Sequence, residues 1–397
     1  MSNNLTFVYH TPFWVEKGIV VTSHAAVGRY VDSLAPYFSE IVLVVPGMGK
    51  GDSIQYSLES SNIRLSPLPH YHNIQSFWFH FPVYCLKMLR SAASWDILNV
   101  RIPTHLGFLA FLSAKLFRKK IFFVVVGEFF SYNNMSNYRL LQQKIVNTDS
   151  VIQDKLMAYM IRKSVTFTNG EVLFEKFHHD NNHVYLMRSS TISLKDINVD
   201  KKIAALHNPI RILTVAVISA RKGSSLIPDI LYHLREMGHN VEWNYVGEPE
   251  GEAGKQELKR MLARATELSI STHLILHGKK SWYELQQYYR DSDLFVLPTF
   301  MEGIPRVLLE AQAAGLPVVT TTVGGIPKAI HNGEDGILVS PGDPVVMVDA
   351  IEKIIQNGDL YCSLATNGLE TARRSSLETE TKRMLKQVGK DLNVPLV

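Results

Sequence analysis

The sequence predicts an α/β protein made of two doubly wound domains. Its 397 residues exceed one ordinary domain, so two domains of about 200 residues are expected. Short apolar runs such as IVLVV and IFFVVV alternate with helix-like segments, which is typical of parallel sheets covered on both faces. The alternation starts afresh at Arg211 with RILTVAVI. We therefore place the domains at 1–205 and 206–370, followed by a C-terminal helical segment at 371–397.

The expected elements follow this alternation along the chain. In the first half we expect strands at 5–9, 41–45, 96–100, 121–126 and 164–168, and helices at 23–38, 106–116 and 149–161. In the second half we expect strands at 211–218, 241–247, 273–278, 293–298 and 318–319, and helices at 224–237, 252–268 and 283–289. Residues 178–208 are polar and irregular, and they form the expected crossing between domains.

The composition, with 46% hydrophobic and 20% charged residues, is typical of a globular protein. The opening residues predict a first β-strand rather than a signal peptide, and no apolar run reaches the ~18 residues needed to span a bilayer. Cys85 and Cys362 lie far apart, which fits a reducing cytoplasm and excludes a cysteine metal cluster. We expect a cytoplasmic protein.

The formal charge is unevenly distributed. Residues 1–205 carry 21 lysines and arginines against 14 acidic residues, whereas residues 206–397 carry 20 against 23. A basic first half indicates an anionic partner such as a phospholipid surface or a lipid pyrophosphate. Ordinary variation in charge between domains explains this asymmetry equally well. We expect no nucleic-acid partner.

Two glutamates mark the most informative segment, FMEGIPRVLLEAQAAGLPVV. Glu302 and Glu310 are eight residues apart, so on one helix they would share a face about two turns, or ~12 Å, apart. That separation suits an elongated ligand with hydroxyls at both ends and phosphates between them. Pro305 suits the first helical turn, and the helix N-terminus after Gly303 offers free N–H groups to phosphates. Two such glutamates alone are more often a solvated surface, but the surrounding glycines and prolines favour function.

This segment resembles the E-x7-E signature of the retaining GT-B glycosyltransferases of the family 4 type, also called glycosyl transferases group 1. GGIPKAI and NGEDGILVSPGD continue the same pattern downstream. The resemblance is dense across 209–358 and thin before it. It implies a GT-B fold of two Rossmann-like domains facing a cleft, with the donor on the second domain and the acceptor on the first. It also implies that the final helix packs back on the first domain.

The resemblance assigns roles on the donor side. Glu302 would face the transferred sugar and the reacting centre, Glu310 would accept hydrogen bonds from the ribose, and Lys222 would neutralise the donor diphosphate. The family's usual arginine falls on Val217, so Arg221 is the candidate to replace it. The further donor-binding candidates are Gly303, Ile304, Pro305, Arg306, Val307, Gly223, Gly247, Glu248, His277 and Gly278. His277 could equally end a strand, and Lys222 could be a solvated lysine at a helix start.

The resemblance implies that the first half of the chain binds the acceptor. Its sequence matches the family pattern less well, so its candidate residues are fewer. Gly18, in an expected loop after the first strand, and His24, at a helix start, are acceptor-side candidates, as are Arg101 and Gly127. His24 could instead bond only to backbone. Glu128 stands where family members often carry a catalytic histidine, so it is a third catalytic candidate beside Glu302 and Lys222.

The segment His70–Ser91 is rich in aromatic residues and carries Lys87 and Arg90. It could enter a membrane interface and meet a polyprenyl-linked acceptor, giving the protein a peripheral contact with the inner membrane. Helix packing in the core explains the same residues and is the favoured interpretation.

The combined expectation is a retaining, metal-independent glycosyltransferase without a cofactor. It would move a sugar from a UDP- or GDP-linked donor to a glycan or lipid-linked acceptor in surface polysaccharide biosynthesis. Asp291-Ser292-Asp293 spells a D-x-D that binds metal in another glycosyltransferase fold, but it precedes a strand at the end opposite the ligand loops. The alternatives are a catalytically degenerate nucleotide-sugar-binding protein and, less favoured, a sugar-nucleotide epimerase.

Overall fold

The computed structural model describes residues 3–49, 53–71, 74–127, 140–187, 191–197 and 206–396, without the side chains of residues 74, 140–145 and 180. The chain forms two compact units. The first contains Met1–Ser189 and Leu377–Val397, and the second contains Ser190–Ser376.

The unit boundaries differ from the domain boundaries at 205 and 370 expected from sequence. Residues 191–197 belong to the second unit because Ile192 and Ile197 pack against Ala313, Leu369 and Ala372. The chain leaves the second unit at Ser376, between two helices. Composition does not mark these points, because the segment 191–197 is short and the two last helices are similarly amphipathic.

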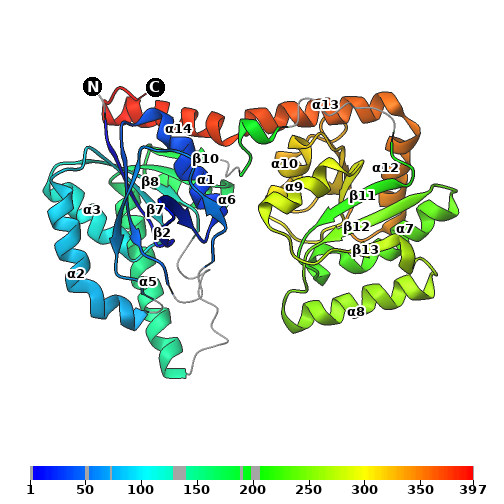
Figure 1. Cartoon of the computed structure of the whole chain (residues 1–397), viewed down its shortest axis with the longest axis horizontal. Coiled ribbons are helices and arrows are strands. Elements are labelled where there is room, and N and C mark those ends of the chain that lie inside the picture. Colours follow the sequence, from blue (N-terminus) through cyan, green and yellow to red (C-terminus); the bar gives the residue numbers. More distant parts are fainter. Residues whose placement is uncertain are drawn as a thin grey trace. The chain divides into compact units, whose positions relative to one another are not determined.

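A seven-stranded parallel sheet lies at the centre of the first unit (Figure 1). In spatial order its strands are β10 (Val184–Met187), β9 (Val165–Asn169), β8 (Lys120–Val125), β7 (Ile97–Ile102), β1 (Leu5–Val8), β4 (Ile41–Pro46) and β6 (Ile63–Leu68). Strand β1 pairs in parallel with β4 on one side and with β7 on the other. Successive side chains alternate between the two faces, so both faces are apolar and need cover.

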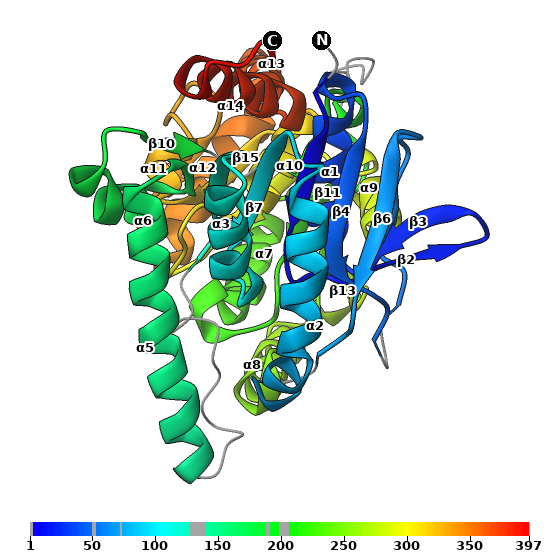
Figure 2. The ribbon, with the colours of Figure 1, turned by 90° about the vertical axis from the view of Figure 1, so that its left-hand side faces the viewer.

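Helices cover both faces of this sheet. Helices α1 (Ala25–Leu34) and α14 (Leu377–Leu392) pack on one face, where β8 presents Phe122 and Val124. Helices α2 (Ile74–Ala92), α3 (Leu106–Leu116) and α5 (Leu140–Arg162) pack on the other, where β8 presents Phe123 and Val125. Figure 2 shows these last three helices side by side, with α3 between α2 and α5. A shorter helix, α6 (Glu171–Phe177), follows β9.

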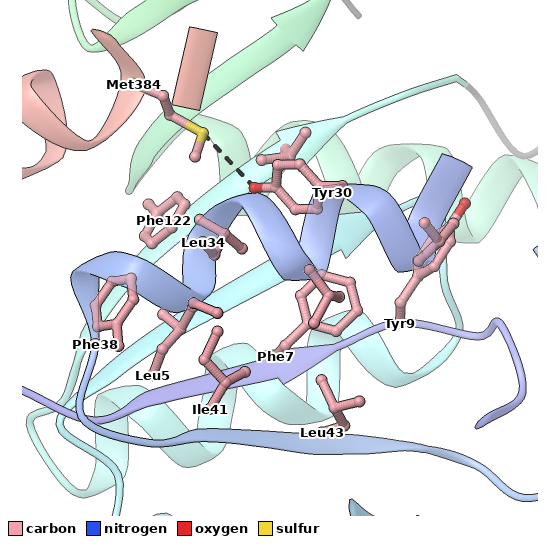
Figure 3. Close-up of a cluster of buried hydrophobic side chains, with 14 of the residues drawn as sticks. Leu5, Phe7, Tyr9, Tyr30, Leu34, Phe38, Ile41, Leu43, Phe122 and Met384 are labelled. Carbon is pink, nitrogen blue, oxygen red and sulfur yellow. Dashed lines mark hydrogen bonds between the residues drawn. The ribbon is translucent and has the colours of Figure 1, made fainter. Parts of the chain in front are cut away.

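Helix α14 completes the core of the first unit although it comes last in the chain (Figure 3). Met384 and Leu385 are buried against α1, and the Tyr30 hydroxyl lies 3.7 Å from the Met384 sulfur. The hydroxyls of Ser33 and Thr381 are hydrogen-bonded at 2.8 Å. The first unit therefore needs residues from both ends of the sequence.

A small antiparallel sheet replaces the loop that sequence analysis expects after the first strand. Strands β2 (Phe13–Glu16) and β3 (Ile19–Thr22) form a hairpin, and β5 (Tyr56–Ser57) pairs with β3. Gly18 therefore lies in a two-residue hairpin turn, at φ 82°, rather than in an open loop. Turns of this kind favour glycine because their backbone takes positive φ.

The second unit contains a six-stranded parallel sheet. In spatial order its strands are β13 (Leu274–Leu276), β12 (Val241–Val246), β11 (Ile210–Val215), β14 (Leu294–Leu297), β15 (Val318–Thr321) and β16 (Ile337–Val339). Helices α7 (Ile227–Glu236), α8 (Gly251–Glu267) and α12 (Pro344–Gln356) cover one face. Helices α9 (Trp282–Arg290), α10 (Arg306–Ala313) and α11 (Ile326–Ala329) cover the other, and α13 (Gly358–Arg374) packs against α10 and α12.

Each sheet has one point where the chain reverses the direction in which it adds strands. In the second sheet this point lies between β11 and β14, and in the first sheet between β1 and β7. Loops leaving adjacent strands there diverge to opposite faces and leave a crevice at the carboxyl ends, where open α/β sheets bind ligands. Among the described residues, no helix combines the length and apolarity needed to cross a membrane.

The packing of α14 predicts that the last helix stabilises the first unit. Leu385→Ala should lower the free energy of unfolding by about 2–5 kcal/mol, because it removes a fully buried side chain. Lys386→Ala, an exposed neighbour on the same helix, is the matched control and should change it by less than about 0.5 kcal/mol. Urea denaturation measures both. Equal stabilities for the two variants would show that α14 is not part of this core.

Candidate active site

Two loops meet at the strand-reversal point of the second sheet. After β11 the chain forms a 3-10 turn, Ala220–Lys222, and then takes positive φ of 68° at Gly223. A Cβ at Gly223 would overlap the carbonyl oxygen of Pro298, which follows β14. The Arg221 carbonyl also accepts a hydrogen bond of 2.8 Å from the Phe300 N–H. Glycine is therefore required at 223 so that the two loops can approach at the backbone.

This approach brings together two predicted catalytic residues, Lys222 and Glu302. Their side chains form an ion pair and are only 13% and 12% exposed. Burial, and next the charge of Arg221, lower the pKa of Lys222 to about 8, while Glu250 opposes the shift. The paired carboxylate of Glu302 favours the charged form of the lysine. The site therefore holds one cation and one anion in close contact.

A third loop supports the backbone of Glu302. After β15, Gly324 takes φ of 55°, and a Cβ there would overlap the Glu302 carbonyl oxygen. The Gly325 N–H donates a hydrogen bond of 2.9 Å to the Gly303 carbonyl. The GGIPKAI motif therefore positions the loop that carries Glu302.

The expectation that Glu302 and Glu310 share one helix face is wrong. Helix α10 covers Arg306–Ala313, with Pro305 as the preceding cap residue, so Glu302 lies in the loop before it. The tight backbone contacts with the loops after β11 and β15 hold residues 299–303 out of helical geometry. The Glu302 side chain is therefore oriented by its loop and by Lys222.

Glu310 is buried in the second turn of α10, and both of its carboxylate oxygens accept hydrogen bonds. Tyr289 on α9 donates at 2.9 Å and Thr191 donates at 3.0 Å. Burial, and next the Glu310 charge, raise the pKa of Tyr289 well above its ordinary value, so it remains a neutral donor. Each carboxylate oxygen can accept more than one hydrogen bond, so acceptance from a ribose hydroxyl stays a prediction.

Arg221 forms its own ion pair. Its guanidinium contacts the Glu250 carboxylate at 3.1–3.2 Å, and both side chains are about half exposed, at 41% and 52%. The charge of Arg221 still reaches Lys222, because it lowers the lysine pKa. The family's usual arginine position is occupied by Val217, whose side chain is 37% exposed. It stays a prediction that Arg221 takes the role of that arginine.

The remaining donor-side candidates lie in the loops after β12 and β13. Gly247 donates its N–H to the Gly278 carbonyl at 2.9 Å, and Glu248 accepts at its carbonyl from Ile218 at 2.8 Å. His277 has protein partners on both ring nitrogens, Asn244 Oδ1 at 2.7 Å and the Tyr288 hydroxyl at 3.3 Å. These contacts fix the ring within its loop.

The loop before α10 leaves its backbone accessible. Gly303, Ile304 and Arg306 are exposed, Val307 is partly exposed and Pro305 is buried. No atom lies within 4 Å of the place where a Cβ on Gly303 would be. The first N–H groups of α10 have no intrahelical acceptor and carry the positive end of the helix dipole. This arrangement can bind an anion.

The first sheet places a second group of basic residues at its own reversal point. His10, after β1, bonds through Nδ1 to the Pro103 carbonyl at 2.9 Å. Burial lowers its pKa to about 4, helped by the charges of His105, His24 and Arg101. His105 Nε2 contacts Asp149 at 3.0 Å. Three histidines and an arginine therefore lie near one another in this unit.

Arg101, at the end of β7, is the buried cation of this group. Its guanidinium lies over the rings of Tyr9 and Tyr30, at 5.6 and 5.1 Å from their centroids. Its Nε is buried and has no hydrogen-bond partner among the described residues. His24 is exposed at the start of α1.

The other acceptor-side candidates are less informative. Gly127 follows β8 and is partly exposed, whereas Gly18 is exposed in the β2–β3 hairpin. Glu128 lies outside the described residues.

The D-x-D sequence has a structural role. Asp293 accepts hydrogen bonds from the Arg211 N–H at 2.7 Å and from the His207 ring at 2.7 Å, and so connects the start of β11 to the start of β14. Within the described part of the chain, no group of three or more histidine, cysteine, aspartate or glutamate side chains gathers as a metal site.

Sequence reasoning missed three residues that the structure places in these groups. Tyr289 and Thr191 orient Glu310, and His10 lies beside Arg101. Position directly after a strand could have identified His10. Neither Tyr289 nor Thr191 stands in a recognisable pattern, because each reaches Glu310 only through tertiary packing.

Residues 196–371 match the family model described as glycosyl transferases group 1. An amylovoran biosynthesis glycosyltransferase of Erwinia amylovora is 34% identical over 158 residues, covering 38% of this chain and 37% of that protein. A D-inositol 3-phosphate glycosyltransferase of Corynebacterium jeikeium is 34% identical over 134 residues, covering 34% and 32%. The chain spans about a third of the length of these curated relatives.

Solved structures extend the likeness over nearly the whole chain. The Anabaena protein HepE in complex with UDP has a TM-score of 0.67 at 15% identity, covering 98% of this chain and 100% of that one. WaaG, a glycosyltransferase involved in lipopolysaccharide biosynthesis, has a TM-score of 0.61 at 14% identity, covering 97% and 99%. At these identities the likeness shows the fold alone, and that fold is GT-B.

The contacts of Gly324 and Gly303 predict that alanine lowers the free energy of unfolding at the first position and leaves it nearly unchanged at the second. Gly324→Ala should lower the free energy of unfolding of the second unit by about 1–3 kcal/mol, because the residue has positive φ and a Cβ would strike the Glu302 carbonyl. Gly303→Ala should change it by less than about 0.5 kcal/mol, because a Cβ there meets no protein atom. Thermal and urea denaturation test both. Similar losses at the two positions would contradict this packing.

Proposed function

We propose that the protein transfers a sugar from a nucleotide diphosphate sugar to a glycan or lipid-linked acceptor, and the match of residues 196–371 to the glycosyl transferases group 1 model supports this. The observation that carries the proposal is the Lys222–Glu302 ion pair at the strand-reversal point of the second sheet. A cation beside a carboxylate at that point suits a ligand whose anionic diphosphate adjoins a hydroxyl-rich sugar. HepE, which has the same fold, was solved with UDP, and this supports a uridine nucleotide as the first donor to test.

In the proposed complex the donor diphosphate meets Lys222 and the free N–H groups at the start of α10. These donors stabilise the negative charge that develops on the leaving diphosphate as the bond to the sugar breaks. Glu302 accepts hydrogen bonds from the sugar, and Glu310 accepts them from the ribose. Tyr289 and Thr191 hold the Glu310 carboxylate in place before the ligand arrives.

The acceptor hydroxyl is proposed to attack from the face that the diphosphate leaves, which retains the anomeric configuration. Lys222 and the helix N-terminus would neutralise the diphosphate, so we propose that no metal is needed. On the acceptor side, buried Arg101 and exposed His24 are the residues proposed to contact the acceptor. The E. amylovora relative acts in amylovoran biosynthesis, and this supports a role in surface polysaccharide assembly.

Glu302 should be required for turnover. Glu302→Gln should reduce the rate of nucleotide release from UDP- or GDP-sugars by about 100-fold or more, because the neutral amide no longer favours the transition-state charge distribution. Glu334→Gln, at an exposed position in another loop, is the matched control and should keep the wild-type rate. Unfolding transitions should coincide for the three proteins.

Three outcomes of this assay separate the candidate functions. Sugar transfer or slow release of the nucleotide supports a transferase. Binding without turnover would identify a degenerate binding protein, and interconversion of sugar nucleotides would identify an epimerase. Wild-type turnover in Glu302→Gln would remove Glu302 from the reaction.

Affinity for UDP should fall as the pH rises through about 8. Lys222 is charged below its lowered pKa of about 8 and neutral above it, so the protein loses a diphosphate contact on the alkaline side. The dissociation constant should rise by up to about tenfold per pH unit above that value. Calorimetric titration between pH 6.5 and pH 9.5 measures this.

Lys222→Arg is the control for this pH dependence, because an arginine stays charged throughout the range. It also controls for ionisation of the nucleotide itself. The variant should bind UDP with little change across the same interval. Parallel pH profiles for wild type and variant would show that Lys222 does not contact the diphosphate.

A further inference from the structure

Helix α2 carries apolar side chains on the face that points away from the sheet. Its inward residues Phe77, Tyr84 and Met88 are buried against the first sheet, as core packing predicts. Phe79, Val83 and Leu86 are nevertheless exposed, and Phe79 is 81% exposed. Their spacing of four and three residues places them in one line along the helix. Core packing therefore explains only half of this helix.

Helix α3 continues the same surface. Figure 2 shows α2 and α3 lying next to each other in front of the first sheet, and the two helices are in contact. Leu112 and Leu116, one turn apart, are exposed, and Leu116 is 70% exposed. Single exposed apolar residues are ordinary, but an aligned set on two adjacent helices marks an interaction surface. We call this set, Phe79, Val83, Leu86, Leu112 and Leu116, the α2–α3 surface.

Basic residues surround the apolar part of this surface. Arg90 continues the line of Phe79, Val83 and Leu86 by one further turn, and Lys87 lies beside it. Lys115 and Arg118 are exposed at the end of α3. Lys119 bonds to the Ala93 carbonyl at 2.8 Å, so the C-terminal ends of α2 and α3 lie together. The cations therefore gather at one end of the α2–α3 surface.

Acidic residues are nearly missing from this part of the sequence. Between residues 74 and 127 there are seven lysines and arginines and one acid, Asp96. Asp96 lies just before β7, at the same end as these cations, and it accepts a hydrogen bond of 3.0 Å from the Asn4 N–H. On the neighbouring helix α5, Asp149 is paired with His105 and Asp154 is partly buried, while Lys155 and Arg162 are exposed. The exposed charges around α2 and α3 are therefore predominantly positive, and such a face complements an anionic surface.

We propose that the α2–α3 surface docks the protein on an anionic lipid bilayer. The aromatic and aliphatic side chains of α2 and α3 would enter the headgroup boundary, and Arg90, Lys115 and Arg118 would contact lipid phosphates. Exposed aromatic and aliphatic side chains bordered by cations are the combination that binds the boundary between headgroups and acyl chains of anionic membranes. The proposal does not rest on the transferase activity, because none of these residues belongs to the candidate site.

Vesicle co-sedimentation of the full chain tests the proposal. The protein should bind vesicles of equal parts phosphatidylglycerol and phosphatidylcholine, and binding to pure phosphatidylcholine should be much weaker. Arg90→Gln with Arg118→Gln should weaken partitioning about 25-fold, at about fivefold for each cation removed. Phe79→Ser with Leu86→Ser should weaken it at least about tenfold. All four positions are exposed, so the fold should be kept.

Matched controls keep the test specific. Val172→Ser removes an 82% exposed apolar residue from α6, and Lys259→Gln removes an exposed cation from α8. Both should bind vesicles as the wild type does. Equal loss in these controls, or no binding of the wild type to anionic vesicles, would overturn the proposal. So would concentration-dependent self-association that the Phe79 and Leu86 changes abolish while vesicle binding persists, since that would identify a second copy as the occupant.

Discussion

Close backbone approach between the loops after β11, β14 and β15 is the constraint on which the candidate site depends. Gly223 and Gly324 permit it, because any Cβ at these positions would overlap a carbonyl of the β14 loop. The approach holds residues 299–303 out of helical geometry and delays the start of α10 to Arg306. Lys222 and Glu302 can pair only because their backbones are held this close. The pairing of Lys222 with Glu302 therefore depends on backbone contacts that only glycine allows at positions 223 and 324.

The two glutamates are buried to a similar extent but have different partners. Glu302 is paired with a lysine whose pKa is lowered to about 8, so the site holds a charge pair that an anionic ligand can rearrange. Glu310 is held by two hydroxyl donors, Tyr289 and Thr191, which orient it and supply no opposing charge. A carboxylate stabilised by neutral hydrogen bonds keeps its charge and its direction. Glu302 is therefore suited to exchange its lysine partner for a ligand, whereas Glu310 is already oriented to meet one.

The first unit combines two kinds of surface on one sheet. At the strand-reversal point, Arg101 is buried over two tyrosines beside His10 and His105. On the helical layer formed by α2 and α3, apolar residues are exposed among cations. The basic charge of the first half of the sequence is therefore distributed between a buried group and an exterior face.

The sequence by itself determined the α/β class, the position of Lys222 after a strand and the helix that carries Glu310, because apolar periodicity and the ends of strands are local properties. The strand order, and with it the two strand-reversal points, came only from the tertiary structure. It also singled out Arg101, which the structure places at the end of β7, while its contact with the acceptor stays a prediction. It wrongly placed Glu302 on the helix that carries Glu310 and missed the hairpin that contains Gly18. It also set the domain boundaries at 205 and 370, whereas the compact units divide after Ser189 and Ser376. These depend on which distant backbones touch: Pro298 against Gly223, Gly324 against Glu302, and α14 against α1. Tertiary structure alone decided which apolar residues of α2 are buried, because helical spacing places them on both sides and only the sheet selects one.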